Sequence, residues 1–256
     1  MKMKAIYSMF LMVAAVALLA ISVPVHATKM DNRIESSSKK SYVFKTYLKD
    51  DDIKIQSKDG AVTLTGIVAN EYHKSLAQET LAGLPGVKSV NNKLEVKGEH
   101  PAEKSDAWIT TKVKTTLLYH RSVSVLTEVN TKDGIVTLKG EADNQAQKDL
   151  TTEYAMDIDG VKDVKNEMTV SKTTKKKSRT TGEKIDDASI TSLVKMTLLL
   201  HRSTSALNTT VATKRGVVTL SGKAGNAAEK DLASKLVNDV RGVKSVKNQM
   251  TIEKSK

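Results

Sequence analysis

Basic side chains are the residues of this sequence whose type and spacing point most directly to chemistry. Residues 172–184 contain six Lys or Arg against one acidic residue, and residues 185–256 contain twelve against six. Residues 105–171 contain eight against eleven. A local excess of positive charge is typical of surfaces that bind anionic lipid, nucleic acid or acidic polymers. The basic candidates for such a surface are Lys175, Lys176, Lys177, Arg179, Arg202, Lys214, Arg215, Arg241, Lys244 and Lys247.

An aromatic flank on a predicted helix is a second candidate for membrane contact. Trp108, Lys112 and Tyr119 are spaced to lie on one side of that helix, offset from its apolar stripe of Ile109 and Val113. Amphipathic rings beside a lysine suit the interface of a membrane with water. The alternative is that Trp108 covers the end of its own core or a neighbouring unit.

The sequence offers little for catalysis, metals or cofactors. It contains no cysteine and only 4% aromatic residues, which argues against thiol chemistry and against an aromatic-lined cofactor pocket. His120-Arg121-Ser122 and His201-Arg202-Ser203 each follow a predicted helix, where positive charge suits the helix dipole. No acidic or histidine partner stands near them at ligand spacing, and no catalytic motif is present. We therefore expect neither enzymatic activity nor a metal or cofactor.

The N-terminus has the order of a secretory signal peptide. Lys2 and Lys4 precede an apolar run from Ala5 to Val23, and small residues stand at Val25 and Ala27. This order predicts a signal peptide over residues 1–27, cleavage after Ala27 and export to the periplasm. The alternative is an uncleaved membrane anchor, because about 18 apolar residues can span a bilayer. Export, and the absence of aromatic residues interleaved with the basic run, argue against nucleic acid as the partner.

One motif occurs three times and sets the frame for these residues. Gly60-Ala-Val-Thr-Leu-Thr-Gly66 recurs at residues 134–140 and 216–222, and a run beginning Gly-Val-Lys starts twenty residues after each second glycine. Internal repetition of this kind indicates tandem structural units. The glycines that we expect to be structural are Gly60, Gly66, Gly86, Gly134, Gly140, Gly160, Gly216, Gly222 and Gly242.

The order of elements is clearest in the second copy. Ile109, Val113 and Leu117 indicate a helix, Lys132-Asp133-Gly134 indicates a hairpin between two strands, and residues 144–158 indicate a second helix before Gly160. A third strand follows, with an irregularity expected near Asn166. Each unit therefore reads as helix, strand, strand, helix, strand, and the first helix of the first copy is expected near residues 43–48. Val62 and Leu64, with their counterparts in the other copies, are expected to face the helices.

The fold class that we predict is α+β, with three αββαβ units, each a small three-stranded sheet covered by two helices. A core of this size is marginal alone, so units are free to dock on each other. The predicted segments are the signal peptide 1–27, a basic linker 28–40, repeat 1 at 41–97, repeat 2 at 105–171, a polybasic linker 172–184 and repeat 3 at 185–254.

The repeated residues resemble the BON domain of bacterial envelope proteins. The resemblance rests on the Asp-Gly-x-Val-Thr-Leu-x-Gly core and on the Gly-Val-x-x-Val-x-Asn run, and the third copy departs from it with Arg215 before the turn glycine. It implies an αββαβ fold, no catalysis, and attachment to anionic phospholipid or to other envelope components, with links to osmotic and envelope stress. We therefore expect a binder of anionic phospholipid surfaces that supports envelope integrity under osmotic stress. The alternative is a periplasmic chaperone-like or protein-interaction module.

Overall fold

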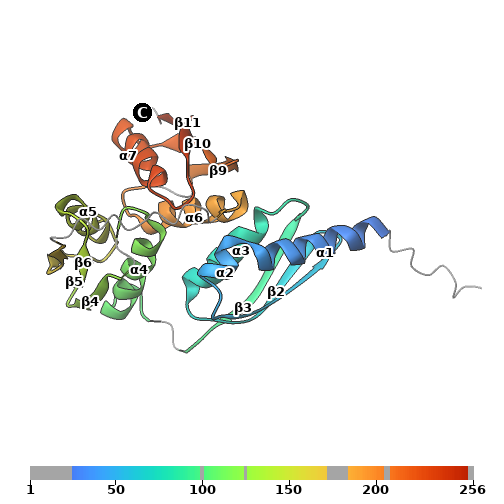
Figure 1. The fold of residues 1–256 in the computed structure, drawn as a ribbon, viewed down its shortest axis with the longest axis horizontal. Helices are drawn as coiled ribbons and strands as arrows, with labels where there is room; N and C mark the ends of the chain where they lie inside the picture. Colours follow the sequence, from blue (N-terminus) through green and yellow to red (C-terminus); the bar gives the residue numbers. More distant parts are fainter. Residues whose placement is uncertain (1–24, 99–100, 124–125, 172–183, 205–207, 253–256) are drawn as a thin grey trace, which may run out of the picture.

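Three αββαβ units form the protein, as the repeats predict (Figure 1). The computed structural model describes residues 25–98, 101–123, 126–171, 184–204 and 208–252. Unit 1 (residues 30–98) contains α1 (Val25–Lys40), α2 (Tyr42–Thr46), β1 (Asp52–Lys58), β2 (Ala61–Val68), α3 (Glu71–Ala82) and β3 (Ser89–Val96). Unit 2 (residues 105–171) contains α4 (Asp106–Tyr119), β4 (Glu128–Lys132), β5 (Ile135–Lys139), β6 (Glu141–Ala142), α5 (Gln145–Met156), β7 (Asp163–Asn166) and β8 (Thr169–Val170). Unit 3 (residues 186–252) contains α6 (Asp187–Leu200), β9 (Thr209–Lys214), β10 (Val217–Ala224), α7 (Ala227–Asn238), β11 (Ser245–Asn248) and β12 (Thr251–Ile252).

The sheets share one topology. In each unit the middle strand pairs antiparallel with the strand before it and parallel with the last strand, which returns after the second helix. On the middle strands, the side chains predicted to face the helices are buried in all three copies, and this prediction is confirmed. They are Val62, Leu64, Val136, Leu138, Val218 and Leu220.

A repeated asparagine stands in the last strand of each unit and interrupts that strand in units 2 and 3. In unit 2, the side-chain amide of Asn166 donates to the Lys148 carbonyl, and its oxygen accepts from the Met168 backbone N–H. Asn92 and Asn248 make the equivalent bonds. The predicted irregularity near Asn166 is therefore confirmed, since β7 ends there and β8 begins at Thr169. The asparagine supplies hydrogen bonds where the strand ladder lacks them.

The predicted linker over residues 28–40 is wrong, because these residues belong to the helix α1. Asp31, Asp106 and Asp187 bind the hairpin turn from equivalent places on the first helices, so Ile34 corresponds to Ile109 and not to a linker position. The sequence did not predict this helix, because its Ser-rich end has few apolar residues on the buried side. Ser38 donates its hydroxyl to the Ile34 carbonyl, and Ser41 caps the short α2 that follows. The predicted helix near 43–48 is thus only the last turn of the first helical segment.

The units pack closely on each other. One hydrophobic core joins residues of units 1 and 3 and includes Tyr119 of unit 2. The approach of α3 to α6 depends on small side chains: a Cβ on Gly83 would lie 3.3 Å from the Cα of Ala188, and Thr80 donates to Ser192 in the buried interface. Figure 1 shows α6 lying between unit 1 and the rest of unit 3, with α4 of unit 2 nearby. Each unit is thin and buries little apolar surface alone, so a core shared with another unit increases the apolar surface that it buries.

Two of the segments predicted from the sequence lie largely outside the residues that the structure describes. Most of the predicted signal peptide, residues 1–24, and residues 172–183 of the polybasic linker lie outside the described residues. Among the helices that the structure does describe, none combines the length and the apolar character that crossing a membrane requires.

The second glycine of the repeated motif is the position least able to accept a side chain. Gly222 has a φ of +117°, and a Cβ there would lie 1.9 Å from the Asn208 carbonyl oxygen. We expect Gly222→Ala to cost about 3 kcal/mol or more of unfolding free energy, because strain and collision add. Gly98→Ala is the control: its φ is +79°, but no atom lies within 4 Å of the added Cβ, so the loss should be about 1 kcal/mol. Urea unfolding followed by circular dichroism measures both, and equal losses would contradict the collision.

Candidate anion-binding site

A carboxylate ties the first helix of unit 3 to its hairpin turn. Asp187, the first residue of α6, accepts hydrogen bonds from the backbone N–H groups of Arg215 (2.7 Å) and Gly216 (2.8 Å). Both turn residues have positive φ, +54° and +79°, and Gly216 tolerates this without a Cβ. The Lys244 backbone N–H donates to the Gly216 carbonyl at 2.9 Å. The helix start, the turn and the beginning of β11 therefore meet at one end of the unit.

A cavity of about 760 Å³ opens at this end and is called here the unit 3 notch. Three exposed cations line it, namely Lys184, Arg215 and Lys244. Two acidic residues also line it, but protein donors occupy their carboxylates: Asp187 binds the turn, and Asp186 accepts from Tyr42 and Ser189. Within the described part of the chain, none of the three cations has an ion-pair partner. The notch therefore presents positive charge to a ligand.

The equivalent places in the other units differ. In unit 2 the turn residue is Asp133, and the cations there are engaged: Lys162 donates to the Asp133 carbonyl at 3.0 Å, and Lys104 lies 3.3 Å from Asp159. In unit 1 the sulfur of Met30 lies 2.7 Å from the position of a Cβ on Gly86, so an apolar side chain occupies the place. The cavity at the equivalent place in unit 2, about 550 Å³, is lined by Lys104 and Lys162 beside Asp106 and Asp133, so a notch with three cations is a feature of unit 3 among the described residues.

Four of the basic residues predicted from the sequence lie around this end of unit 3. Arg215 and Lys244 line the notch. Lys214 pairs with Val217 and Lys247 with Thr219, so both lie on the sheet face opposite the helices. All four side chains are exposed. The structure thus extends the positive charge from the notch onto the open sheet face.

Two other predicted basic residues lie elsewhere. Arg202 is 3.7 Å from Asp157 of unit 2, and Arg241 donates its Nε–H to the Leu118 carbonyl at 3.3 Å. Both belong to the contact between units 2 and 3. Arg202 is exposed and Arg241 is half-buried, and their membership of the lipid-binding surface stays a prediction. Lys175, Lys176, Lys177 and Arg179 lie outside the described residues.

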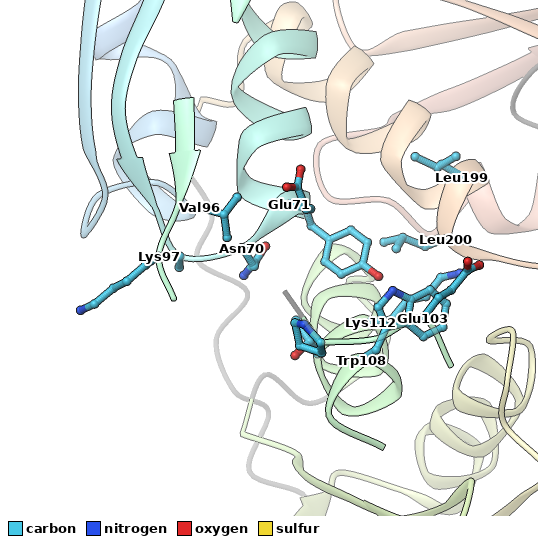
Figure 2. A pocket seen from close by; sticks show the side chains of 13 residues that line it. Asn70, Glu71, Val96, Lys97, Glu103, Trp108, Lys112, Leu199 and Leu200 are labelled. Atoms are coloured by element: carbon cyan, nitrogen blue, oxygen red, sulfur yellow. The ribbon is translucent and has the colours of Figure 1, made fainter. Parts of the chain in front are cut away.

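The predicted aromatic flank is only partly present. The Lys112 ammonium lies 4.5 Å from the centre of the Trp108 ring, and burial lowers the pKa of Lys112. Figure 2 shows this pair close to Leu200 of α6, and both side chains line a cavity of about 570 Å³ where the three units meet. Tyr119 is 1% exposed and packs edge-on against the Tyr47 ring, so placing it on an exposed flank is wrong. A neighbouring unit covers it, which the helix spacing alone does not reveal.

Sequence reasoning missed two sets of polar residues. Asp31 and Asp106 bind their hairpin turns as Asp187 does, and an acid placed 28 or 29 residues before each turn glycine is a signal that could have found them. His120 and His201 lack acidic neighbours in the sequence but meet Asp239 and Asp157 across the contact between units. The described residues contain no group of three or more acidic or histidine side chains arranged to hold a metal ion.

This architecture is a tandem array of αββαβ domains with one basic end. The BON domain family matches residues 30–98, 105–172 and 186–254, and the chain belongs to this family. The chain is 34% identical to the osmotically-inducible protein Y of Escherichia coli (strain K12) over 143 residues, covering 54% of this chain and 71% of that protein. It is also 29% identical over 151 residues to an uncharacterized protein in the gshII 5′ region of Anaplasma centrale, covering 59% of this chain and 97% of that protein.

A solved structure of CdsD, a structural protein of the Type III secretion system of Chlamydia trachomatis, is also similar. It is 16% identical and covers 88% of this chain and 92% of that chain, with a TM-score of 0.26. A score this low supports no argument about either protein.

Removing the carboxylate that holds the hairpin should weaken unit 3. Asp187→Ala leaves the Arg215 and Gly216 N–H groups without their acceptor, and we expect a loss of about 1–3 kcal/mol in unfolding free energy. Asp143→Ala, at an exposed position in unit 2, is the control and should change stability by less than about 0.5 kcal/mol. Urea unfolding of the full chain measures both. Equal, small effects would show that the turn does not depend on Asp187.

Proposed function

We propose that this BON protein is an exported, non-enzymatic envelope protein that binds anionic phospholipid surfaces through the basic end of unit 3. The observation that carries the proposal is the unit 3 notch, where Lys184, Arg215 and Lys244 surround an open cavity without ion-pair partners among the described residues. A phosphate headgroup matches this arrangement, because it supplies negative charge and several acceptor oxygens. Lys214 and Lys247 add charge on the adjacent sheet face.

The energy available is adequate for reversible attachment. A basic side chain near an anionic membrane contributes about 1 kcal/mol, and the effect falls off within a Debye length of about 10 Å at moderate salt. Five exposed cations at one end of unit 3 therefore supply several kcal/mol. Residues 172–184 carry a further basic run, and we propose that it acts together with this end. Unit 2, with its acidic balance, then serves as a spacer docked on its neighbours.

The link to osmotic stress comes from the relative in E. coli, whose name describes it as osmotically inducible. We propose that this chain likewise acts when osmotic stress disturbs the envelope. Binding of phosphate headgroups at the membrane surface is the means by which it would support envelope integrity.

A protein-interaction or chaperone-like role is the second candidate. The cavity where the three units meet favours it, since Tyr72, Trp108 and Leu199 offer apolar surface there and Leu199 is 51% exposed. Contiguous apolar surface on a folded protein is typical of sites that bind other molecules. Suppression of client aggregation without any vesicle binding would favour this role over lipid attachment.

Removing positive charge from the notch should weaken vesicle binding, and the effect should grow with the number of charges changed. With phosphatidylglycerol vesicles at low salt, we expect Lys244→Gln to weaken binding about 5-fold and Arg215→Asp about 30-fold, at about 1 kcal/mol per charge. Arg215→Asp restores the residue type that units 1 and 2 carry at this turn, so the fold should be kept. Cosedimentation of the full chain measures the binding.

The matched control is Lys162→Gln, which changes the lysine of unit 2 that corresponds to Lys244. It should leave vesicle binding within about 2-fold, because Asp133 stands beside it. Equal binding to neutral phosphatidylcholine vesicles, or equal effects of Lys162→Gln and Lys244→Gln, would remove the electrostatic mechanism at unit 3.

Export makes its own prediction. Cleavage after Ala27 would leave Thr28 as the first residue and would keep Asp31, whose carboxylate holds the turn of unit 1. N-terminal sequencing of the protein from the periplasmic fraction should therefore begin at Thr28. A chain that still begins at Met1 in the membrane fraction would establish the uncleaved anchor instead.

A further inference from the structure

Units 2 and 3 contact each other through a reciprocal arrangement. The last residues of α4 and α6 are each followed by His-Arg-Ser, and each such segment lies against the turn after the second helix of the other unit. The Arg121 N–H donates to the Asp239 carbonyl and the Arg202 N–H donates to the Asp157 carbonyl, both at 2.9 Å. The two units therefore use the same segment and the same receiving turn, related by an approximate two-fold axis.

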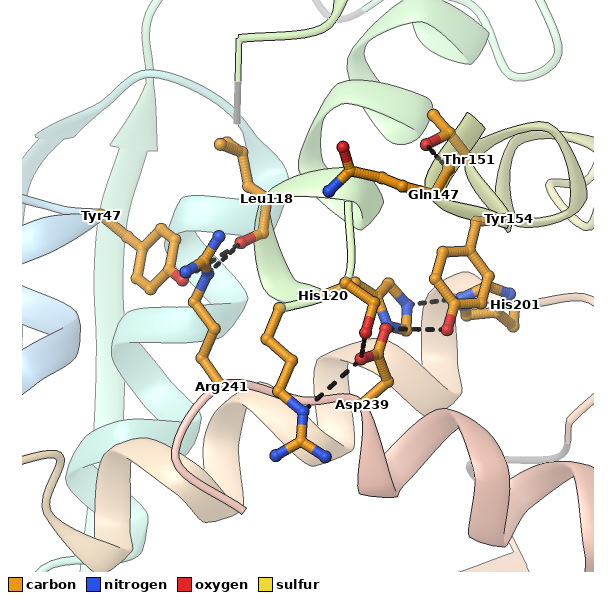
Figure 3. A network of polar contacts seen from close by, with 11 residues as sticks. Tyr47, Leu118, His120, Gln147, Thr151, Tyr154, His201, Asp239 and Arg241 are labelled. Atoms are coloured by element: carbon orange, nitrogen blue, oxygen red, sulfur yellow. Dashed lines mark hydrogen bonds and ion pairs between the residues drawn. The ribbon is translucent and has the colours of Figure 1, made fainter. Parts of the chain in front are cut away.

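Two histidines meet at the centre of this contact. His120 and His201 are 0% and 1% exposed, and their Nε2 atoms lie 3.1 Å apart (Figure 3). Each ring turns its other nitrogen to a carboxylate of the opposite unit. His201 Nδ1 lies 2.9 Å from Asp157 Oδ2, and His120 Nδ1 lies 3.2 Å from Asp239 Oδ2.

Both carboxylates are held by further groups. Ser122 and Tyr154 donate to Asp239, and Ser203 donates to Asp157. Burial raises the pKa of both acids, but the hydrogen bonds from these groups and from the histidines outweigh it, so each pKa lies below its ordinary value. The carboxylates are therefore ionised at neutral pH.

The remaining charges around the pair are cationic. Arg121 Nε lies 3.6 Å from Asp239 and Arg202 Nε lies 3.7 Å from Asp157, while the positive charge of Arg241 lowers the pKa of His120. The Tyr154 ring stacks on His120 with centroids 3.8 Å apart.

The geometry fixes how many protons the pair can hold. An ionised carboxylate only accepts hydrogen bonds, so the acid that each Nδ1 faces favours a hydrogen on that nitrogen, although His120 Nδ1 and Asp239 Oδ2, at 3.2 Å, are not aligned for a hydrogen bond. The two Nε2 atoms, at 3.1 Å, then have room for one hydrogen between them, which one nitrogen donates and the other accepts. The closed pair therefore holds three hydrogens, one more than two neutral rings carry, and the two carboxylates balance its single positive charge. A second hydrogen would place two N–H groups head to head, and the rings could keep it only by moving apart.

We propose that His120 and His201 form a proton-sharing pair that joins unit 2 to unit 3, and that uptake of one more proton on acidification separates these two units. Because each ring belongs to a different unit, moving the rings apart means opening the contact. This inference concerns the arrangement of the units and does not depend on what the protein binds.

The sign of the pH dependence follows from the burial of the rings. Burial lowers the pKa of His120, so the closed contact resists the additional proton while an opened, hydrated ring accepts it near the ordinary value of about 6.5. Opened rings together carry two additional protons below that pH and none above it, whereas the closed pair carries one, so the contact is strongest near that pH and weakens as the pH falls below it. The two aspartates have lowered pKa values, so their contribution is lost only at more acidic pH, below their ordinary value of 3.8.

A distance measurement on the full chain tests the proposal. The chain has no cysteine, so Ala146→Cys on α5 and Ala228→Cys on α7, at equivalent exposed positions, can carry spin labels alone. Pulsed electron paramagnetic resonance should give one narrow distance distribution at about pH 6.5, near the ordinary histidine pKa, and a longer, broader one at about pH 5, reversibly. Circular dichroism should show that the units remain folded. An unchanged distance at both pH values overturns the proposal.

Variants identify the titrating group. His201→Gln places an amide beside His120 that can donate or accept, so the labelled protein should stay closed at about pH 5. His73→Gln is the matched control, because His73 also pairs with an aspartate, Asp51 at 2.6 Å, but within unit 1. It should leave the opening unchanged. If the contact between units 2 and 3 opens at the same pH in His201→Gln as in the unsubstituted protein, the proposal is contradicted.

A second measurement applies if His201→Gln is already open at about pH 6.5. Nuclear magnetic resonance titration of the unsubstituted chain should show the additional proton entering the pair over the pH range in which the label distance lengthens. Independent titration of His120 and His201, each as an ordinary exposed ring, would overturn the proposal.

Discussion

One carboxylate in each unit, on the first helix, receives the two N–H groups of the β-hairpin turn, and much of the remaining structure depends on this bond. Asp31, Asp106 and Asp187 make it in the three copies. It fixes where the first helix crosses the end of the sheet, and hence which side chains of that helix enter the core. Ile34, Ile109 and Ile190, each three residues further along, are all 1% exposed. In units 2 and 3 the residues that make this bond also line the cavity at that end of the unit.

The thinness of the units explains how they associate. A sheet of three strands under two helices buries few apolar side chains, so each unit gains stability by packing on another. Units 1 and 3 do this with a shared apolar core, where Gly83 and Ala188 allow close approach. Units 2 and 3 do it with apolar side chains, since Leu236 of unit 3 belongs to the core of unit 2, and with polar groups at the helix ends, where the backbone N–H of Arg121 and that of Arg202 each donate to a carbonyl in the opposite unit. An apolar contact changes little with pH, whereas a contact built on histidines and aspartates does.

The sequence predicts the fold well where local rules act and poorly where partners come from another unit. The glycines at the turns and the Val/Leu alternation of the middle strands are local signals, and they lead to the αββαβ order. The helix α1 escaped prediction because its Ser-rich end carries almost no apolar periodicity, although Ile34 anchors it. Tyr119 and the two buried histidines could not be placed, since the groups that cover them are distant in the sequence; Asp239 lies 119 residues after His120.

The three copies show how one frame allows one unit to specialise. Each copy forms the same turn, and a few side chains decide what lies beside it. Met30 occupies the place in unit 1, Asp133 and the Lys104–Asp159 ion pair offset the positive charge in unit 2, and Arg215 adds a cation to the notch of unit 3. Arg215 adopts a φ of +54°, which suits aspartate or asparagine better than arginine. Arg215 therefore costs stability at its own turn, where the other two copies keep the more favourable aspartate. In exchange, it places a positive charge in the notch.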